Sequence, residues 1–269
     1  MTMVRESSFI DSSIQKKEGF ISTGIDKLDR LLEGGIPCGF TAVLLGSPGS
    51  STEILVKQIA AGGNVTYIPT EETKVEIIDT MKRFKWQIPE VDFVDISEKY
   101  YSNVLRGEQK RVSIYEQRSK LKLKELIEIG STAMPTTVTG DEDFLAVLSN
   151  KTKNVMVKRT IIINSLDFFL SQYGAEEVLK TIYAAKVNNL KNKGALMIVM
   201  TKGIHGDLFE RKMEGLADGV LELDVVQKGS SFERYLSVKK MRNFAKKIGI
   251  ARYVIDDSGF VLEMIERIM

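Results

Sequence analysis

The sequence is poor in the residues that build disulfide frameworks and most metal sites. Its 269 residues include one cysteine, Cys38, and one histidine, His205. A lone cysteine excludes an internal disulfide and a cysteine-rich metal cluster, and it is typical of proteins from a reducing compartment. Histidine-based metal sites and serine–histidine triads are disfavoured because His205 is the only imidazole. We therefore assign no metal-ligating residue and expect His205 to be solvated.

Long hydrophobic runs are also missing. No apolar run approaches the roughly 20 residues that a membrane-spanning helix needs. The first 19 residues, MTMVRESSFIDSSIQKKEG, lack the apolar core of a signal peptide. The charges nearly balance, with 38 basic and 36 acidic side chains, so the whole chain is not a strongly basic nucleic-acid binder. We expect a cytoplasmic protein with no membrane partner.

Apolar residues make up 43% of the chain and recur in a regular order. Alternating strands and helices with short connections predict an α/β fold with a mostly parallel central sheet flanked by helices. Two antiparallel C-terminal hairpins are predicted at 220–226 with 234–240 and at 253–256 with 260–263. We expect strands at 40–45, 65–69, 91–96, 154–164 and 195–200, and helices at 24–35, 54–61, 73–84 and 176–193.

The same patterns divide the chain into an N-terminal arm, residues 1–20, and a single domain, residues 21–269. Within that domain, residues 102–135 form a charged helical elaboration. Seven basic and four acidic side chains lie between Arg106 and Glu128. A solvated helix face with ion pairs explains this composition, and a basic surface over 102–128 that docks nucleic acid or a partner is the alternative.

The stretch GSPGSSTE, residues 46–53, lies between an apolar run and a helical pattern. It has the outline of the phosphate-binding loop G-x-x-x-x-G-K-[ST], whose amides and lysine hold phosphates while its hydroxyl holds Mg²⁺. Ser51 replaces the second glycine, Thr52 the lysine and Glu53 the hydroxyl. Loss of a hydrogen bond from the lysine would weaken binding by about tenfold to a hundredfold.

These replacements also suggest a structural role for the loop. Ser50 and Glu53 have the spacing of a capping box, in which a serine and a glutamate satisfy amides at the start of a helix. A carboxylate in the first helical turn also suits the helix dipole. We therefore expect that the loop fills its anion-binding position with its own side chains.

Five segments in this order resemble the RecA superfamily, and most closely its KaiC-like branch. They are STGIDKLDRLLEGGIPCG (22–39), YIPTEET (67–73), KRFKW (82–86), GLADGVLEL (215–223) and SVKKMRN (237–243). The resemblance implies a RecA-like P-loop fold. It also implies that subunits assemble into homo- or hetero-oligomers with RecA/KaiC-like partners.

The resemblance assigns roles to particular residues. Gly46, Ser47, Pro48, Gly49, Ser50, Ser51, Thr52 and Glu53 would form the nucleotide loop. Asn164 occupies the position of the aspartate that orients Mg²⁺, and its alternative is a strand-end cap; Asp167 could replace that aspartate only if the chain turned back.

Glu71 and Glu72 match the glutamate pair that supplies a general base, although they could also begin a helix capped by Thr70. Lys240 and Arg242 match the element that reaches a neighbouring subunit's nucleotide, and their alternative is a basic strand end.

These features favour a pseudo-ATPase that acts as a regulatory or scaffold subunit, with ATP and Mg²⁺ binding weak or lost. One alternative is an active, atypical ATPase that borrows a cation. Lys202 could lie near the phosphates, whereas Lys57 is expected to point away. The other is a DNA-associated accessory protein resembling RadA paralogues.

Overall fold

A nine-stranded sheet forms the centre of the computed structural model, which describes residues 18–88, 91–119, 142–244 and 249–263. Its strand order is β11-β10-β9-β8-β3-β7-β6-β4-β5. The strands from β8 to β5 run parallel: β3 (Thr41–Gly46), β4 (Val65–Pro69), β5 (Asp92–Phe93), β6 (Thr160–Asn164), β7 (Ala195–Thr201) and β8 (Gly219–Lys228). The expected mostly parallel sheet is therefore confirmed.

The C-terminal strands close the other side of the sheet as antiparallel hairpins, as the sequence predicts. They are β9 (Ser231–Met241), β10 (Gly249–Asp256) and β11 (Gly259–Glu263). A separate two-stranded sheet joins β1 (Phe20–Ile21) to β2 (Ile36–Pro37).

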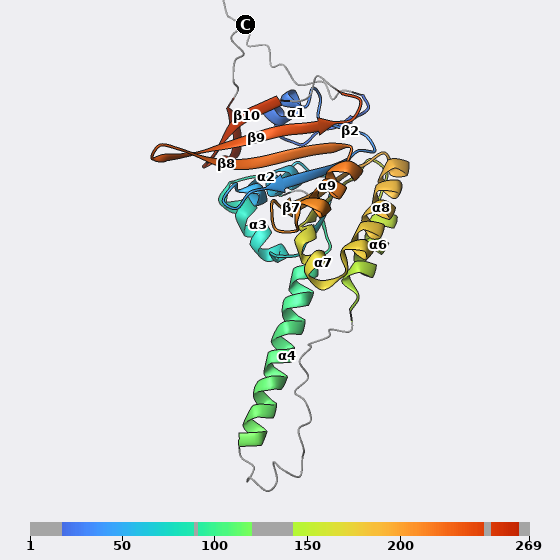
Figure 1. The fold of residues 1–269 in the computed structure, drawn as a ribbon, viewed down its shortest axis with the longest axis vertical. Coiled ribbons are helices and arrows are strands. Elements are labelled where there is room, and N and C mark those ends of the chain that lie inside the picture. The colour runs from blue at the N-terminus through green and yellow to red at the C-terminus, as the bar shows by residue number, and fades with distance from the viewer. Residues whose placement is uncertain (1–17, 89–90, 120–141, 245–248, 264–269) are drawn as a thin grey trace, which may run out of the picture.

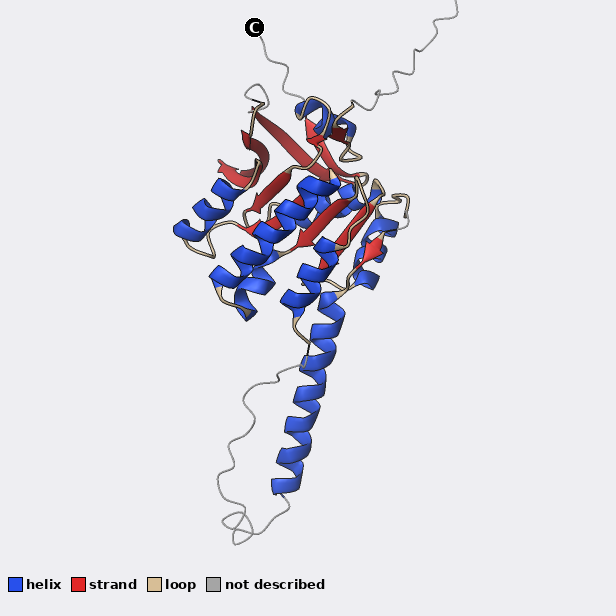
Figure 2. Ribbon diagram, turned by 90° about the vertical axis from the view of Figure 1, so that its right-hand side faces the viewer, coloured by secondary structure: helices blue, strands red, loops and turns tan. Residues whose placement is uncertain are grey.

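Helices cover both faces of the sheet because the parallel strands are apolar on both sides (Figure 2). Along β3, Leu44 packs into one core and Val43 and Leu45 into the other, and all three are essentially inaccessible to solvent. The first core includes α1 (Asp26–Leu31), α2 (Thr52–Ala61) and α3 (Lys74–Arg83). The second includes α6 (Phe144–Lys153), α7 (Leu166–Gln172), α8 (Ala175–Asn192) and α9 (Asp207–Leu216).

The long helix α4 (Ile96–Ser119) projects from this body (Figure 1). Ile96 is buried in the second core and Tyr100 packs against that core, so only the first turns are anchored. Further along, Leu105 and Tyr115 are exposed. The helix is the described part of the predicted elaboration, whose residues 120–135 lie outside the described residues.

Several expected boundaries are wrong. The strand expected at 91–96 ends at Phe93, because the chain turns into α4 at Ile96. The strand expected at 154–164 begins only at Thr160, because residues 154–159 connect α6 to β6. The sequence reading also missed α6, α7 and α9. Residues 1–17 of the predicted arm, residues 1–20, lie outside the described residues, and Phe20 begins β1. The division into arm and domain therefore stays a prediction.

Parallel strands bring their carboxyl ends to one edge of the sheet. Gly46 pairs with Thr201, and Pro69 pairs with Asn164. The segments that follow β3, β4, β6 and β7 therefore converge, as ligand-binding segments do in open α/β sheets. None of the helices in the described part of the chain is long and apolar enough to cross a membrane.

Candidate nucleotide-loop site

The loop from Gly46 to Thr52 is held in place by its neighbours. The Ser47 amide and hydroxyl both donate to the Leu223 carbonyl, and the Val225 amide donates to the Ser47 hydroxyl. On the outer side, Arg234 Nε donates to the Gly49 carbonyl at 3.2 Å. The loop is thus tied to β8 and β9 before it enters α2.

The loop's own hydroxyls fill its inner side. Ser50 Oγ and Thr52 Oγ1 are 2.8 Å apart, and both residues are buried. A Cβ added to Gly46 would lie 2.1 Å from Thr52 Oγ1, so the threonine side chain packs directly over this glycine. Thr52, which stands in the lysine position, therefore folds against the loop.

The expected capping box is wrong. Helix α2 begins after Ser51, which has a left-handed backbone (φ 59°) and makes no side-chain capping bond. Ser50 contacts Thr52, and Glu53 is exposed. The true capping box lies at α3, where Thr73 and Glu76 exchange hydrogen bonds. The alternative cap at Thr70 is also wrong, because the Thr70 hydroxyl bonds to the Ser165 backbone.

A cleft of about 160 Å³ lies above the loop. Residues 46–53, Glu71, Asn164 and Ser165, and the end of β7 line it. The structure thus brings together the loop, one of the two predicted glutamates and Asn164. Glu53 and Glu71 are the charged residues of the lining, which includes no lysine or arginine among the described residues.

Glu71 is the member of the glutamate pair that reaches the cleft. Ser165, which directly follows β6, donates a hydrogen bond from Oγ to Glu71 Oε1 at 2.6 Å. Tyr101 on α4 donates to the Glu71 carbonyl. The first turns of α4 are therefore coupled to the residue that could act as a general base.

Glu72 points elsewhere and pairs with Lys57. Lys57 Nζ lies 2.5 Å from Glu72 Oε1, and the lysine side chain is only 2% exposed. Lys57 lies on the inward face of α2 and does not line the loop cleft, which agrees with the expectation that it points away from the phosphates. The sequence ILVKQIAA (54–61) indicates that Lys57 is buried, because this lysine lies within an almost wholly apolar helix.

Asn164 contacts Tyr67, a fully buried residue that the sequence reading did not single out. Asn164 Nδ2 donates to the Tyr67 hydroxyl oxygen at 2.9 Å. Burial raises the pKa of Tyr67 far above its usual value, and the charge of Glu72 adds to this rise. The asparagine therefore helps satisfy a buried phenol at the strand end.

Lys202 lies beside the loop but is paired with carboxylates. Its amide donates to the Gly46 carbonyl, while its Nζ lies 2.5 Å from Glu222 Oε1 and 2.9 Å from Asp224 Oδ1. Burial alone would raise the pKa of Glu222, but hydrogen bonds from Lys202 and Lys239 overcome it and hold that pKa at about 2. Lys202 is thus part of an ionic cluster on β8.

Lys240 and Arg242 lie outside the cleft of their own chain. Lys240 Nζ donates to the Glu214 carbonyl at 2.7 Å, and Arg242 is 2.9 Å from Asp218. Burial and the nearby Arg242 charge lower the pKa of Lys240. Their predicted role towards a neighbouring subunit stays a prediction.

His205 and Asp167 form a pair. His205 Nε2 lies 2.7 Å from Asp167 Oδ1, and the histidine side chain is 15% exposed, so the expectation of a solvated histidine is wrong. Asp167 also accepts from the Thr201 amide. It lines a neighbouring cleft rather than the loop cleft, so it does not replace the aspartate absent at position 164.

Comparison with known proteins agrees with this architecture. A model of the family described as "ATPase: KaiC" matches residues 21–267. The chain belongs to the KaiC family of ATPases. The family therefore covers nearly the whole chain, from the first described strand onward.

Individual relatives of this KaiC-family chain are distant. A UPF0273 protein of Methanocaldococcus jannaschii is 22% identical over 252 residues, covering 90% of this chain and 95% of the relative. One from Sulfurisphaera tokodaii is 25% identical, covering 90% and 82%. The crystal structure of a KaiC-like protein from Pyrococcus horikoshii matches with a TM-score of 0.59 at 17% identity, covering 91% and 99%. That likeness concerns the fold.

Proposed function

We propose that this KaiC-family protein is a pseudo-ATPase that binds MgATP weakly or not at all. It acts as a regulatory or scaffold subunit through its surfaces. The observation that carries the proposal is the lining of the loop cleft, where Glu53 and Glu71 supply the charge. Two carboxylates repel a polyphosphate, and the lysine that would offset them is replaced by Thr52.

The size of the cleft supports the same proposal. Ligand pockets usually measure about 300–1,000 Å³, whereas this cleft measures about 160 Å³. The contact between Thr52 and Gly46 keeps the inner side of the loop filled. The residues present therefore do not suit MgATP.

The contacts of the candidate cations argue against another lysine or arginine of the same chain replacing the missing P-loop lysine. Lys57 is held by Glu72, and Lys202 by Glu222 and Asp224. Lys240 and Arg242 are held near α9. Freeing Lys57 or Lys202 would break its ion pair with a partly buried carboxylate, Glu72 or Asp224, and this has a free-energy cost.

An active, atypical ATPase is the second candidate, and Glu71 favours it. Its carboxylate lies in the cleft and is oriented by Ser165, as a general base would be. A cation would then have to come from another subunit.

Phosphate release and oligomeric state, measured on the same sample, separate the two candidates. A scaffold subunit should form the same oligomer with and without MgATP and should release no phosphate above background. Turnover that Glu71→Gln abolishes, or an oligomer that forms only with MgATP, would favour the active enzyme and contradict the proposal.

A further inference from the structure

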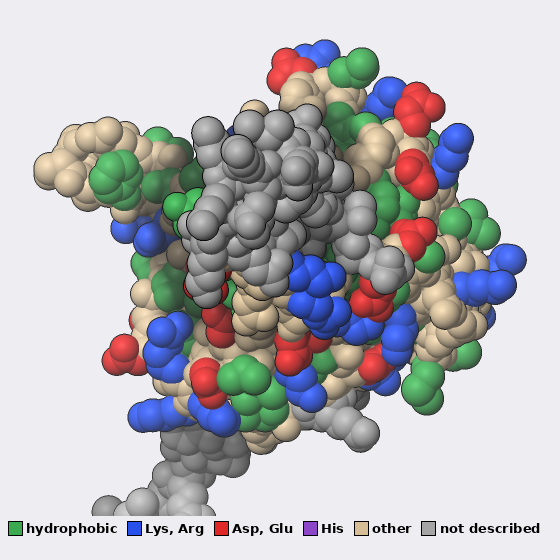
Figure 3. All heavy atoms as spheres, turned by 90° about the horizontal axis from the view of Figure 1, so that it is seen from below, with side chains coloured by type: hydrophobic (Ala, Val, Ile, Leu, Met, Phe, Trp, Pro, Cys, Tyr) green, Lys and Arg blue, Asp and Glu red, His purple; other side chains and the backbone are tan. Residues whose placement is uncertain are grey.

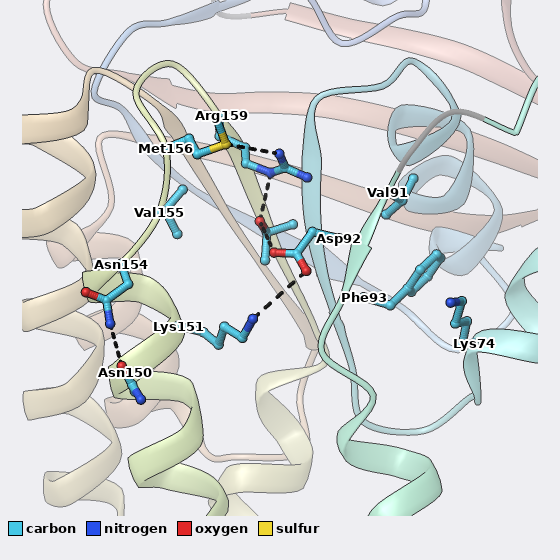
Figure 4. Close-up of a pocket in the computed structure, with 11 residues that line it drawn as sticks. Lys74, Val91, Asp92, Phe93, Asn150, Lys151, Asn154, Val155, Met156 and Arg159 are labelled. Carbon is cyan, nitrogen blue, oxygen red and sulfur yellow. Dashed lines mark hydrogen bonds and ion pairs between the residues drawn. The ribbon is translucent and has the colours of Figure 1, made fainter.

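A second cleft, of about 920 Å³, opens at the β5 edge of the sheet (Figure 4). It lies between β5, the start of α3 and the last turns of α6. Thr66 and Asp92 face each other near the starts of β4 and β5, and Arg159 directly precedes β6. The nucleotide loop follows the other end of β3, and the two clefts share no lining residue.

Positive charge in this cleft exceeds negative charge. Among the described residues, its lining includes Lys74, Lys151 and Arg159 and one carboxylate, Asp92. Lys151 Nζ is 4.0 Å from Asp92 Oδ1, the outer limit of an ion pair. Among the residues described here, neither Lys74 nor Arg159 forms an ion pair with a carboxylate, so Lys151 alone of the three cations is paired with Asp92.

The guanidinium of Arg159 is fixed in place without losing its charge. Its Nε donates to Thr66 Oγ1 and one terminal nitrogen donates to the Val65 carbonyl, both at 2.9 Å. Its other terminal nitrogen lies 3.8 Å from the sulfur of Met156 (Figure 4). Two neutral acceptors therefore orient the group, while its charge stays available to an anion.

The rest of the lining combines hydrogen-bonding amides with an apolar wall. Asn154 Nδ2 donates to Asn150 Oδ1 at 2.5 Å, which orients the two amides side by side. Val91 and Phe93 lie on the opposite side, where Lys74 Nζ is 5.5 Å from the Phe93 ring centroid (Figure 4). A ligand could thus place an anionic group near α6 and a carbon-rich group against β5.

We propose that this cleft binds a small phosphorylated organic molecule. Lys151 and Arg159 hold the phosphate oxygens, and Val91 and Phe93 contact the organic part. Arginine suits a phosphate because its planar fork can donate two parallel hydrogen bonds. The volume lies within the usual range for small-molecule sites, about 300–1,000 Å³. This site is independent of nucleotide binding at the loop.

Magnetic resonance of the full chain locates the binding. Inorganic phosphate and AMP, added without Mg²⁺, should shift the backbone amides of Thr66, Phe93 and Asn154 and leave those of residues 46–53 in place. AMP should bind more tightly than phosphate because only AMP reaches the apolar wall. Shifts confined to residues 46–53, or no shift with either probe at millimolar concentration, would overturn the proposal.

Calorimetry with AMP tests the cation that we assign to the phosphate. Lys151→Ala should weaken binding about tenfold to a hundredfold, because it removes a hydrogen bond to a charged group. Lys151 is exposed, so the variant should fold. Lys153→Ala is the matched control, since it lies in the same last turn of α6 but outside the cleft lining, and it should bind like the native protein. Equal affinity of the Lys151→Ala and native proteins would contradict the proposal.

Discussion

At the residue scale, the pairing of Lys57 with Glu72 distinguishes a buried cation from a surface one. The ammonium is almost fully buried, whereas the glutamate side chain is 32% exposed and can turn towards water. Removing Glu72 therefore leaves the buried Lys57 ammonium without a partner, whereas removing Lys57 leaves a carboxylate that water can reach.

We predict that Glu72→Ala lowers the free energy of unfolding by about 3 kcal/mol, the low end for breaking a buried ion pair. Lys57→Met should cost less, because the remaining carboxylate can be hydrated and the methionine fills the space. Denaturant unfolding of both variants gives the comparison. A larger loss in Lys57→Met than in Glu72→Ala would show that the glutamate is the stranded group.

Glu222 predicts how stability depends on pH. The pKa of its carboxyl group is about 2 in the folded protein and 4.5 in the unfolded chain. A depressed pKa contributes stability that is fully present above the unfolded value and is lost as pH falls through the folded value. Stability should therefore decline between about pH 4.5 and pH 2.

The variant Glu222→Gln isolates this effect. It should be less stable at neutral pH, because Lys202 and Lys239 lose a charged acceptor, and its decline across that acid range should be shallower than in the native protein. Thermal unfolding across the pH series measures both. Parallel curves for the two proteins would mean that other carboxylates set the acid limit.

At the element scale, the starts of α2 and α3 differ in their capping. Thr73→Ala removes a capping box and should cost about 1 kcal/mol. Ser51→Gly should be neutral or stabilising by up to about 1 kcal/mol, because Ser51 has a left-handed backbone that glycine adopts without strain. Denaturant unfolding gives the free energy of unfolding of both variants. A clear decrease in that free energy for Ser51→Gly would mean that the serine side chain supports the loop.

Elements with strong periodicity were predictable from the sequence, but the contacts of individual side chains were not. The strands at 65–69 and 195–200 and the helix at 176–193 match β4, β7 and α8 closely. The capping box failed because Ser50 bonds to Thr52, a contact that depends on the fold of the loop. His205 was misplaced for the same reason, since its partner Asp167 lies 38 residues away in sequence.

At the scale of the whole molecule, 38 basic side chains nearly balance 36 acidic ones. On the face seen from below, basic and acidic side chains are interspersed (Figure 3). Along α4, Arg111 pairs with Glu108 at 2.8 Å, and both are half exposed. This pair is what a solvated helix face predicts, and a basic docking surface over 102–128 stays the alternative.

We predict that Arg106→Gln/Lys110→Gln leaves single-stranded oligonucleotide binding unchanged at physiological salt. Fluorescence anisotropy over a salt series measures it, with the native protein as the control. If these variants instead reduced both affinity and its salt dependence, α4 would be a nucleic-acid contact.

We propose that the loop of this KaiC-family protein binds MgATP weakly or not at all. Calorimetry tests this most directly. MgATP and MgADP would be titrated into the native protein and into Ser51→Gly/Thr52→Lys/Glu53→Thr, which restores the P-loop pattern. We predict no measurable heat of binding for the native protein and clear binding by the restored loop. Micromolar binding by the native protein would contradict the account.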